Sequence, residues 1–432
     1  MGGGLLQLVA YGAQDVYLTG NPQITFFKVA YRRHTNFALE AIEQTFNGNA
    51  SYGSRVTCQI SRNGDLINRM YLQVKLPTKT SNKYVPFYGL RLLNYVEIEI
   101  GGQKIDKHYS HWLYIWNELS LPKSKRQGYN EMVGAYGKDT IAGSTLYIPL
   151  EFWFCRNIGL ALPLIALQYH EVKVNINFEN ADNMTSLSPS TDLTSNPFTA
   201  TMWVDYIYLD TDERRRFAQL SHEYLIEQLQ FTGQEAIASN PIKTKLNFNH
   251  PCKELIWFIA KNPSDATSRS NWCNYTTNEA VLGAADADYT LSSLTALQQA
   301  DINFNGSKKN KINGSAFNPV QSAKLVLNGN DRFYERPGRY FNIVQPYQHH
   351  ENIPTNAGIN VYSFALKPEE HQPSGTLNMS RIDTAVLNLT FEKSTVSGGT
   401  FDATTAHTLF VYAVNYNVLR ILSGMGGLAY SN

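Results

Sequence analysis

The chain has 432 residues, which is long enough for two or three domains. Only 17% of the residues are charged and 12% are aromatic, which excludes a disordered chain because disorder requires high charge and few aromatic side chains. A formal net charge of +1 argues against nucleic-acid binding, since that requires clustered lysine and arginine.

Neither the cysteines nor the first residues suggest a secreted protein. No C-x-x-C pair occurs, which favours reduced thiols in a cytosolic protein over disulfides or a zinc site. The first nine residues lack the basic region and apolar core of a signal peptide, and Leu6 breaks the myristoylation motif. Since no apolar stretch reaches 18 residues, we expect no membrane span.

The first half predicts a glycine-containing arm followed by short strands. Alternating apolar and polar residues, ended by glycine, proline or asparagine, are typical of strands. The helical spacing of Trp112, Ile115, Trp116 and Leu119 predicts a helix over 111–119. We expect an arm at 1–25, strands near 24–27, 57–60, 63–67, 70–76, 96–109, 146–154, 171–178 and 202–208, and loops at 78–90, 122–145 and 180–200.

The second half predicts the same kind of structure after a partly helical connector at 213–223. Residues 261–320 form the longest polar stretch, and a loop of that length is usually functional or exposed. The last residues are again rich in glycine. We expect strands at 224–232, 245–251, 254–260, 323–334, 384–391 and 409–416, an exposed loop at 261–320 and an arm at 422–432.

Three strand patterns of the first half recur in the second half in the same order and at a nearly constant offset. Residues 96–109, which turn at Gly101-Gly102, correspond to 323–334, which turn at Asn328-Gly329. The other two pairs are 171–178 with 384–391, and 202–208 with 409–416, where Tyr208 is matched to Tyr416. A duplicated β-domain explains the repeat most simply. About eight strands per half is the number found in a jelly roll.

The sequence offers no convincing catalytic or metal site. The pair His108 and His111, with Asp106 nearby, is the best metal candidate. However, nothing indicates a third ligand, and the segment is rich in tyrosine and tryptophan. His349-His350-Glu351 places adjacent side chains on opposite sides of the chain. The glycines at 424–427 resemble a phosphate loop but lack its lysine and helix. We therefore expect no enzyme activity, no catalytic residue, no metal and no cofactor.

Seven Asn-x-Ser/Thr sequons occur in this Asn-, Ser- and Thr-rich chain. Without a signal peptide, most of them are expected by chance. Asn274, Asn305 and Asn313 fall in the long polar stretch of the second half, so they are the candidates if the protein carries covalent glycans.

Several long blocks resemble the major capsid proteins of nucleocytoplasmic large DNA viruses, and the members from algal and amoebal viruses most of all. These blocks are spread over the whole chain. They are Gln7–Lys28, Tyr31–Phe37, Ile60–Leu66, Gly159–Lys173, His222–Gly233, Asn415–Arg420 and Ser423–Tyr430.

The resemblance implies an all-β chain of two tandem eight-stranded jelly-roll sandwiches with short helices and long loops. The domains would be an N-terminal arm at 1–25, a first jelly roll at 26–212, a connector at 213–223, a second jelly roll at 224–421 and a C-terminal arm at 422–432. Three chains would form a capsomer of hexagonal outline, and capsomers would tile the icosahedral shell of a large DNA virus.

The same resemblance implies partners and location. The protein would contact other copies of itself, minor capsid proteins and an internal viral membrane near the base of the capsomer, but not nucleic acid. Long loops would project outward, where some relatives carry sugars. The protein would be made and assembled in the host cytoplasm and reside in the virion.

Two alternatives remain open. A carbohydrate-binding or carbohydrate-cleaving jelly roll would need aromatic platforms beside paired carboxylates, and Trp112 and Trp116 with Glu118 come nearest to this. A minor or penton-type capsid component usually has one jelly roll, which the duplication disfavours.

Overall fold

The computed structural model describes residues 10, 12–23, 31–77, 84–135, 142–185, 191–237, 239–261, 269, 272–276, 318–391 and 407–430. The chain divides into two compact units, Met1–Phe37 and Ala38–Asn432. The first unit contains the 3-10 turn η1 (Ala13–Asp15) and the short helix α2 (Val16–Thr19), whose Tyr17 and Leu18 are almost fully exposed. Across the described parts of the chain, no helix has the length and apolarity needed to cross a lipid bilayer.

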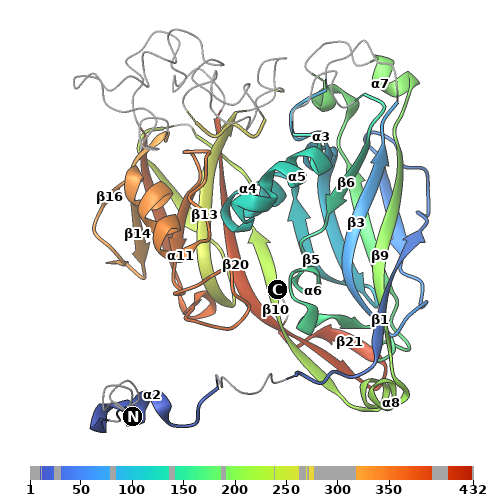
Figure 1. Cartoon of the computed structure of the whole chain (residues 1–432). Helices are drawn as coiled ribbons and strands as arrows, with labels where there is room; N and C mark the ends of the chain where they lie inside the picture. Colours follow the sequence, from blue (N-terminus) through green and yellow to red (C-terminus); the bar gives the residue numbers. More distant parts are fainter. Residues whose placement is uncertain are drawn as a thin grey trace, which may run out of the picture. The chain divides into compact units, whose positions relative to one another are not determined.

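The first half of the chain forms two facing sheets (Figure 1). Sheet I has the strand order β1-β9-β3-β6, with β7 added to β3, and sheet II has the order β2-β8-β4-β5. The strands of sheet I are β1 (Phe37–Gln44), β9 (Thr199–Leu209), β3 (Leu66–Lys75), β6 (Thr145–Pro149) and β7 (Leu162–Pro163). Those of sheet II are β2 (Arg55–Gln59), β8 (Val172–Phe178), β4 (Leu93–Ile100) and β5 (Gln103–Tyr109).

The second half repeats this arrangement. Sheet III has the order β10-β20-β13-β17, and sheet IV has the order β12-β19-β14-β15. Sheet III contains β10 (His222–Phe231), β20 (His407–Leu422), β13 (Pro251–Lys261) and β17 (Asn360–Ser363), with β11 (Glu235–Ala236), β18 (Leu377–Asn378) and β21 (Met425–Leu428) paired at its borders. Sheet IV contains β12 (Ile242–Leu246), β19 (Ala385–Phe391), β14 (Val320–Leu327), β15 (Asn330–Asp331) and β16 (Arg336–Pro337).

The identical strand order confirms the double jelly roll expected from the sequence. Sheets I and III correspond strand for strand, as do sheets II and IV. The glycines of the two matching turns, Gly101 and Gly329, both adopt positive φ, which only glycine tolerates without strain. The predicted alignment of strand 202–208 with strand 409–416 was out of register. It matched Trp203 to Val411, but Trp203 points out of the first sandwich whereas Val411 points into the core of the second.

Short helices connect the strands. They are α3 (Tyr88–Leu92), α4 (Ser110–Ser120), α5 (Lys123–Val133), α6 (Trp153–Arg156), α7 (Thr191–Ser195), α8 (Thr211–Gln219), the π-helical η6 (Tyr340–Val344) with α11 (Gln345–His349), and the 3-10 turns η3 (Ile158–Leu160), η4 (Ala181–Met184) and η7 (Met379–Arg381). In the sequence, helix α8 follows β9 of the first jelly roll and precedes β10 of the second, and it overlaps the connector that we expect at 213–223. Asp212 and Glu213 in its first turn favour this helix start by interacting with the helix dipole.

Three expected loops and one expected arm contain ordered elements, and the loops at 78–90 and 180–200 include the start of α3 and both η4 and α7. Residues 122–145, expected as a loop, contain α5, and the segment 146–154, expected as one strand, ends in α6. The expected C-terminal arm at 422–432 contains β21, which pairs with β20. The strand expected at 24–27 lies outside the described residues, and the first strand among the residues that the structure describes is β1.

Sheet III is buried on both faces and therefore belongs to two cores. Leu255, Trp257 and Val411 point into the second sandwich. Ile256, Phe258 and Tyr412 alternate with them and join the core of the first sandwich. Because successive side chains of a strand point to opposite faces, sheet III contributes one set of side chains to each of two apolar cores.

Candidate functional site

The candidate functional site is the junction, which we define as the contact of the outer face of sheet III with α4 and β5 of the first jelly roll. Its centre is an aromatic cluster. Phe258 and Phe410 stack with their ring centroids 5.0 Å apart, and Tyr412 meets Trp112 of α4 edge to face at 5.8 Å. Such pairs are worth about 0.5–1.5 kcal/mol beyond the area that they bury. The junction is thus packed like a protein core.

Helix α4 is the element that fills the junction. Its sequence is apolar around most of its circumference, and nine of its eleven residues are buried. A helix with no polar face must be covered on all sides, which is why α4 lies between the sandwiches and not on the surface. Figure 1 shows it beside β13 and β20 of the second jelly roll.

The predicted metal trio lies at this junction, but its three members do not converge on one point, because His111 is held by a different partner from Asp106 and His108. Asp106 accepts a hydrogen bond from the backbone N–H of Leu229 at 3.1 Å and pairs with His108 at 2.9 Å. His111 instead shares a hydrogen bond of 2.8 Å with the hydroxyl of Tyr275. Among the described residues, no group of three or more His, Cys, Asp and Glu side chains could hold a metal ion.

A buried ion cluster crosses the junction. Arg156 of α6 donates from Nη1 to Oε2 of Glu227 at 2.9 Å, and Nζ of Lys253 donates to Oε1 of the same carboxylate at 2.9 Å. Burial alone would raise the pKa of Glu227, but its hydrogen bond with His371 and the charges of Arg156 and Lys253 hold it at about 2. Glu227 is therefore ionised at neutral pH and holds both sandwiches through its two oxygens.

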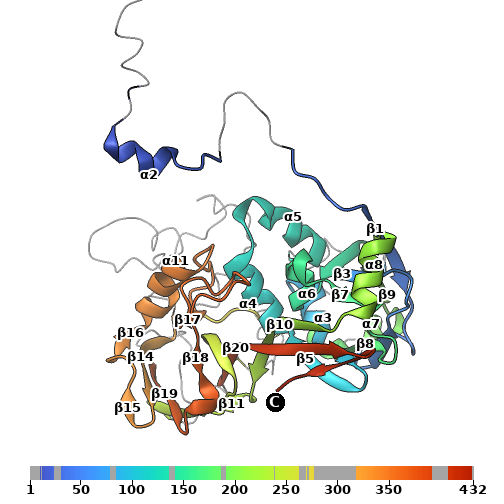
Figure 2. The same ribbon diagram turned by 90° about the horizontal axis from the view of Figure 1, so that it is seen from below.

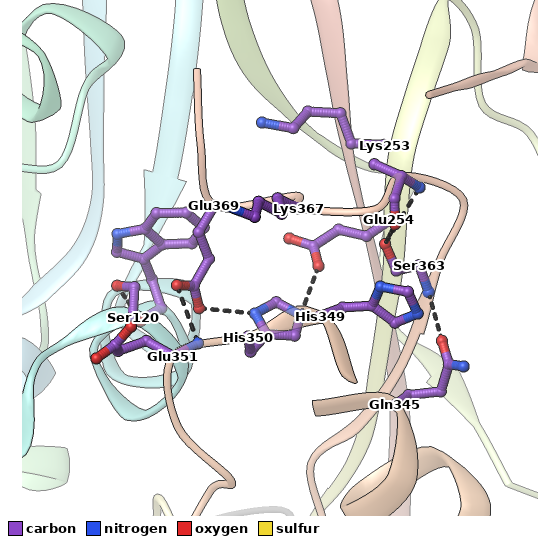
Figure 3. A network of polar contacts seen from close by, with 12 residues as sticks. Ser120, Lys253, Glu254, Gln345, His349, His350, Glu351, Ser363, Lys367 and Glu369 are labelled. Carbon is purple, nitrogen blue, oxygen red and sulfur yellow. Dashed lines mark hydrogen bonds and ion pairs between the residues drawn. The ribbon is translucent and has the colours of Figure 1, made fainter. Parts of the chain in front are cut away.

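A second buried network lies beside α4 in the second jelly roll (Figure 3). The His350 ring sits between two carboxylates, with Nε2 2.9 Å from Glu254 and Nδ1 2.8 Å from Glu369. Burial lowers the pKa of His350, but the two carboxylates outweigh it and raise the pKa to about 9. The sequence alone does not indicate this network, because adjacent side chains such as those of His349-His350-Glu351 are expected to diverge. The partners of His350 come from distant segments instead.

The loop between α11 and β17 secures the end of α4. The side-chain amide of Asn352 donates to the backbone carbonyl oxygens of Leu119 and Leu121, at 3.2 and 2.6 Å. Thr355 donates to the Glu118 carboxylate through both its backbone N–H and its hydroxyl. Glu118 is thus used to hold the second jelly roll. With Trp112 and Trp116 also buried, these residues offer no platform for a sugar, contrary to that alternative.

Part of the long polar stretch expected to be exposed is also buried here. Trp272 donates from its indole N–H to the Pro86 carbonyl at 2.8 Å, and Tyr275 packs on Phe258. Asn274, one of the three glycosylation candidates, is only 7% exposed, and its Oδ1 accepts hydrogen bonds from the backbone and hydroxyl of Thr276. Asn305 and Asn313 lie outside the described residues, so those two stay predictions.

The C-terminal strand closes the other end of the junction. β21 folds back on β20 and reaches the first jelly roll, where the backbone N–H of Leu428 donates to Gln103 and that of Tyr169 donates to the Gly424 carbonyl. Gly426 is needed for this contact, because an added Cβ would lie 2.6 Å from the Leu167 side chain. We call β21 and its contacts with the first jelly roll the C-terminal latch.

Taken together, the junction has the chemistry of a rigid joint. No sequence motif connects Arg156, Glu227 and Lys253, because they come from three separate segments. The one signal was a charged pair, Lys253-Glu254, inside an otherwise apolar strand, since charges there must be paired or neutralised.

Comparison with known proteins agrees with this architecture. Residues 25–210 match the family profile described as major capsid protein N-terminus, and residues 213–427 match that described as large eukaryotic DNA virus major capsid protein. The chain is 52% identical to the major capsid protein of Pyramimonas orientalis virus and 48% identical to that of Phaeocystis pouchetii virus, with all of both chains covered in each case. It superposes on the quasi-atomic model of the PBCV-1 virus capsid with a TM-score of 0.78 and 40% identity, covering 94% of this chain and all of the other.

Proposed function

The chain belongs to the major capsid protein family of large eukaryotic DNA viruses, and from this premise we propose that it assembles as a homotrimer. Each trimer is a capsomer of pseudo-hexagonal outline, and capsomers tile an icosahedral shell. The protein acts by self-association and performs no catalysis.

The observation that carries the proposal is the rigid pairing of two sandwiches with the same strand order. Three chains with two equal lobes each give a ring of six similar lobes. Hexagonal tiling requires such near-equivalent edges, and a flexible joint between lobes would blur them. The apolar junction, the ion cluster and the C-terminal latch supply that rigidity.

Self-association of this kind depends on buried area. Apolar surface contributes roughly 25 cal/mol per Å² when it leaves water, before the entropic cost of association. A stable interface buries about 1,200–2,000 Å² in total. Side chains such as Tyr347, Leu366 and Tyr147 are exposed on the separate chain and available for such contacts.

The remaining partners follow from the same proposal. Minor capsid proteins and an internal membrane would lie at the base of the capsomer, close to the N-terminal arm, while the genome stays behind that membrane. Glycans would be attached to outward loops, with Asn305 and Asn313 as candidates. Assembly would take place in the host cytoplasm and the product would be the virion shell.

The solution mass of the purified chain tests the trimer. Light scattering after size exclusion should give three times the 48.7 kDa of one chain, and electron microscopy should show six-lobed particles. A chain that stays monomeric at high concentration, with or without its viral assembly factors, contradicts the proposal.

A further inference from the structure

The repeat extends to the helices beside the sheets. In the first jelly roll, α4 follows β5 and precedes β6. In the second, η6 and α11 follow β15 and β16 and precede β17. Since β5 corresponds to β15 and β6 to β17, the η6–α11 helix is the counterpart of α4.

Within the chain, α4 is covered by the outer face of sheet III, through Phe258, Phe410 and Tyr412. Sheet III is the counterpart of sheet I. The chain therefore contains one sheet face that is packed on one helix. It also contains a second sheet face and a second helix of the same kind, which are not packed on each other. The spare halves are the outer face of sheet I and the surface of η6–α11.

The outer face of sheet I carries a row of aromatic side chains, which we call the aromatic row: Tyr147, Tyr71 and Trp203. Tyr71 and Trp203 stack in parallel with their centroids 6.2 Å apart, and Tyr71 meets Tyr147 edge to face at 6.0 Å. Gln73 fixes the row by accepting from the Trp203 indole N–H at 2.8 Å. Tyr147 is 38% exposed, and Tyr71 and Trp203 are partly exposed, so this ordered face is open in the separate chain.

The η6–α11 surface is also apolar and open. Tyr347 is 76% exposed and Val344 is 37% exposed. Leu366, 70% exposed, is held next to the helix because Nδ1 of His349 donates to its carbonyl at 2.9 Å. Figure 2 shows α11 on one side of the double jelly roll and β9 and β3 on the opposite side, so one chain cannot join its own two surfaces.

We infer that the aromatic row of one copy packs on the η6–α11 surface of the next copy, repeating between chains the contact that sheet III makes with α4 within the chain. This inference rests on the trimer proposed above. The contact is heterologous, because each chain gives a different face to each neighbour, and a heterologous contact generates a ring when the rotation closes. Three copies related in this way place six jelly rolls in equivalent contacts.

The composition of the two faces fits this role. The face of sheet III is covered as soon as the chain folds, and the apolar side chains of Ile256, Phe258 and Tyr412 form its centre. The aromatic row passes through a solvated stage before assembly, and it is interleaved with Gln73 and Thr201. Tyrosine and tryptophan are the side chains enriched in interfaces that form between folded partners.

Two variants test the inference, each removing one face from every chain. Trp203→Glu changes the aromatic row, and Tyr347→Glu changes the η6–α11 surface. Each should raise the concentration needed for half-maximal trimer formation at least about tenfold, while the melting temperature of the monomer stays within a few degrees. Leu220→Glu is the control, since this exposed residue belongs to neither face and should leave the trimer unchanged. If Trp203→Glu fails to fold, Tyr147→Glu replaces it.

Mixing the two variants distinguishes a heterologous contact from a symmetric one. Each variant keeps one intact face, so a mixture should form a one-to-one dimer that neither variant forms alone. A photoreactive benzoylphenylalanine in place of Tyr147 should cross-link to residues 340–349 or to Leu366 of a second copy. The inference is wrong if both variants trimerise as readily as the wild-type chain, or if the cross-link forms with other residues. The proposed trimer itself would not be affected by either result. A wild-type chain that never trimerises overturns both.

Discussion

Arg156 of the first jelly roll and Glu227 of the second form a buried ion pair of 2.9 Å across the junction. The Arg156 guanidinium also lies 4.3 Å from the ring centroid of Trp116, which orients it. Because Lys253 holds the other oxygen of Glu227, the carboxylate is fully used by cations from both sides.

We predict that Arg156→Met destabilises the folded chain by about 3 kcal/mol, since removing one partner of a buried pair leaves a charge without full compensation. Urea unfolding followed by tryptophan fluorescence measures the change. Arg420→Met is the matched control, because Arg420 and Glu223 pair at 2.8 Å on the surface between β10 and β20. Its cost should stay below about 1 kcal/mol. If the two variants lose the same free energy of unfolding, the buried cluster does not stabilise the fold more than a surface ion pair does.

The second prediction concerns alkaline pH and His350. Its pKa is raised from 6.5 to about 9 in the folded chain, so the protonated ring stabilises the fold fully below pH 6.5. This contribution is lost as the pH rises from 6.5 through 9. We expect His350→Gln to be less stable at pH 6 and to lose less further stability up to pH 9 than the wild type. Urea midpoints at pH 6, 7.5 and 9 give the comparison, and parallel profiles would refute the assignment.

The third prediction has the opposite sign and concerns His111. Its ring lies among Phe258, Phe410, Trp272 and Tyr275, and burial, with the charge of Arg91, lowers its pKa to about 3. The unfolded chain takes up a proton near pH 6.5, whereas the folded chain does not. Stability contributed by the neutral ring is therefore complete above pH 6.5 and is lost as the pH falls toward 3.

Between pH 6.5 and 4, we expect the free energy of unfolding of His111→Phe to fall less than that of the wild type. Some decrease remains, because other groups also titrate in this range. The loss of the hydrogen bond to Tyr275 adds a cost of about 1 kcal/mol that does not depend on pH. Thermal unfolding at half-unit pH steps separates the two effects. A profile as steep as that of the wild type would show that His111 does not titrate as described.

Local patterns predicted the strands well, because alternation and turn glycines act over a few residues. The turn at Gly101 and its repeat at Gly329 are examples. The register of β20 was missed because it is buried on both faces, so alternation cannot show which side faces the nearer core. Helix α5 was missed because it is polar, although Pro122 before it and Gly134 after it are ordinary helix boundaries.

The junction could be predicted only in part. The apolar circumference of α4 was visible in the sequence, but what covered it was not. The ion cluster depends on the folded path, because residues 156, 227 and 253 meet only when α6, β10 and β13 come together. The role of Tyr275 was hidden for a different reason, since the polar stretch around it suggested an exposed loop. A short apolar or aromatic group inside such a stretch is the signal that identifies an anchor.

The fourth prediction concerns the C-terminal latch and Gly426. Valine at this position would place its side chain against Leu167 and Ile100, where even a Cβ would be only 2.6 and 3.3 Å from the nearest atoms. Because the side chains around the site are themselves buried in the core, overpacking should cost about 1–3 kcal/mol. It should also detach β21, so that the amides of residues 426–428 exchange with deuterium faster while those of β19 do not.

Gly128→Ala is the control, since this exposed glycine of α5 has open space around it and alanine there should stabilise the helix by about 0.5–1 kcal/mol. If the amides of β21 still exchange slowly in Gly426→Val, the C-terminal latch tolerates the larger side chain. The close approach of Gly426 to Leu167 is then not what holds β21 in place.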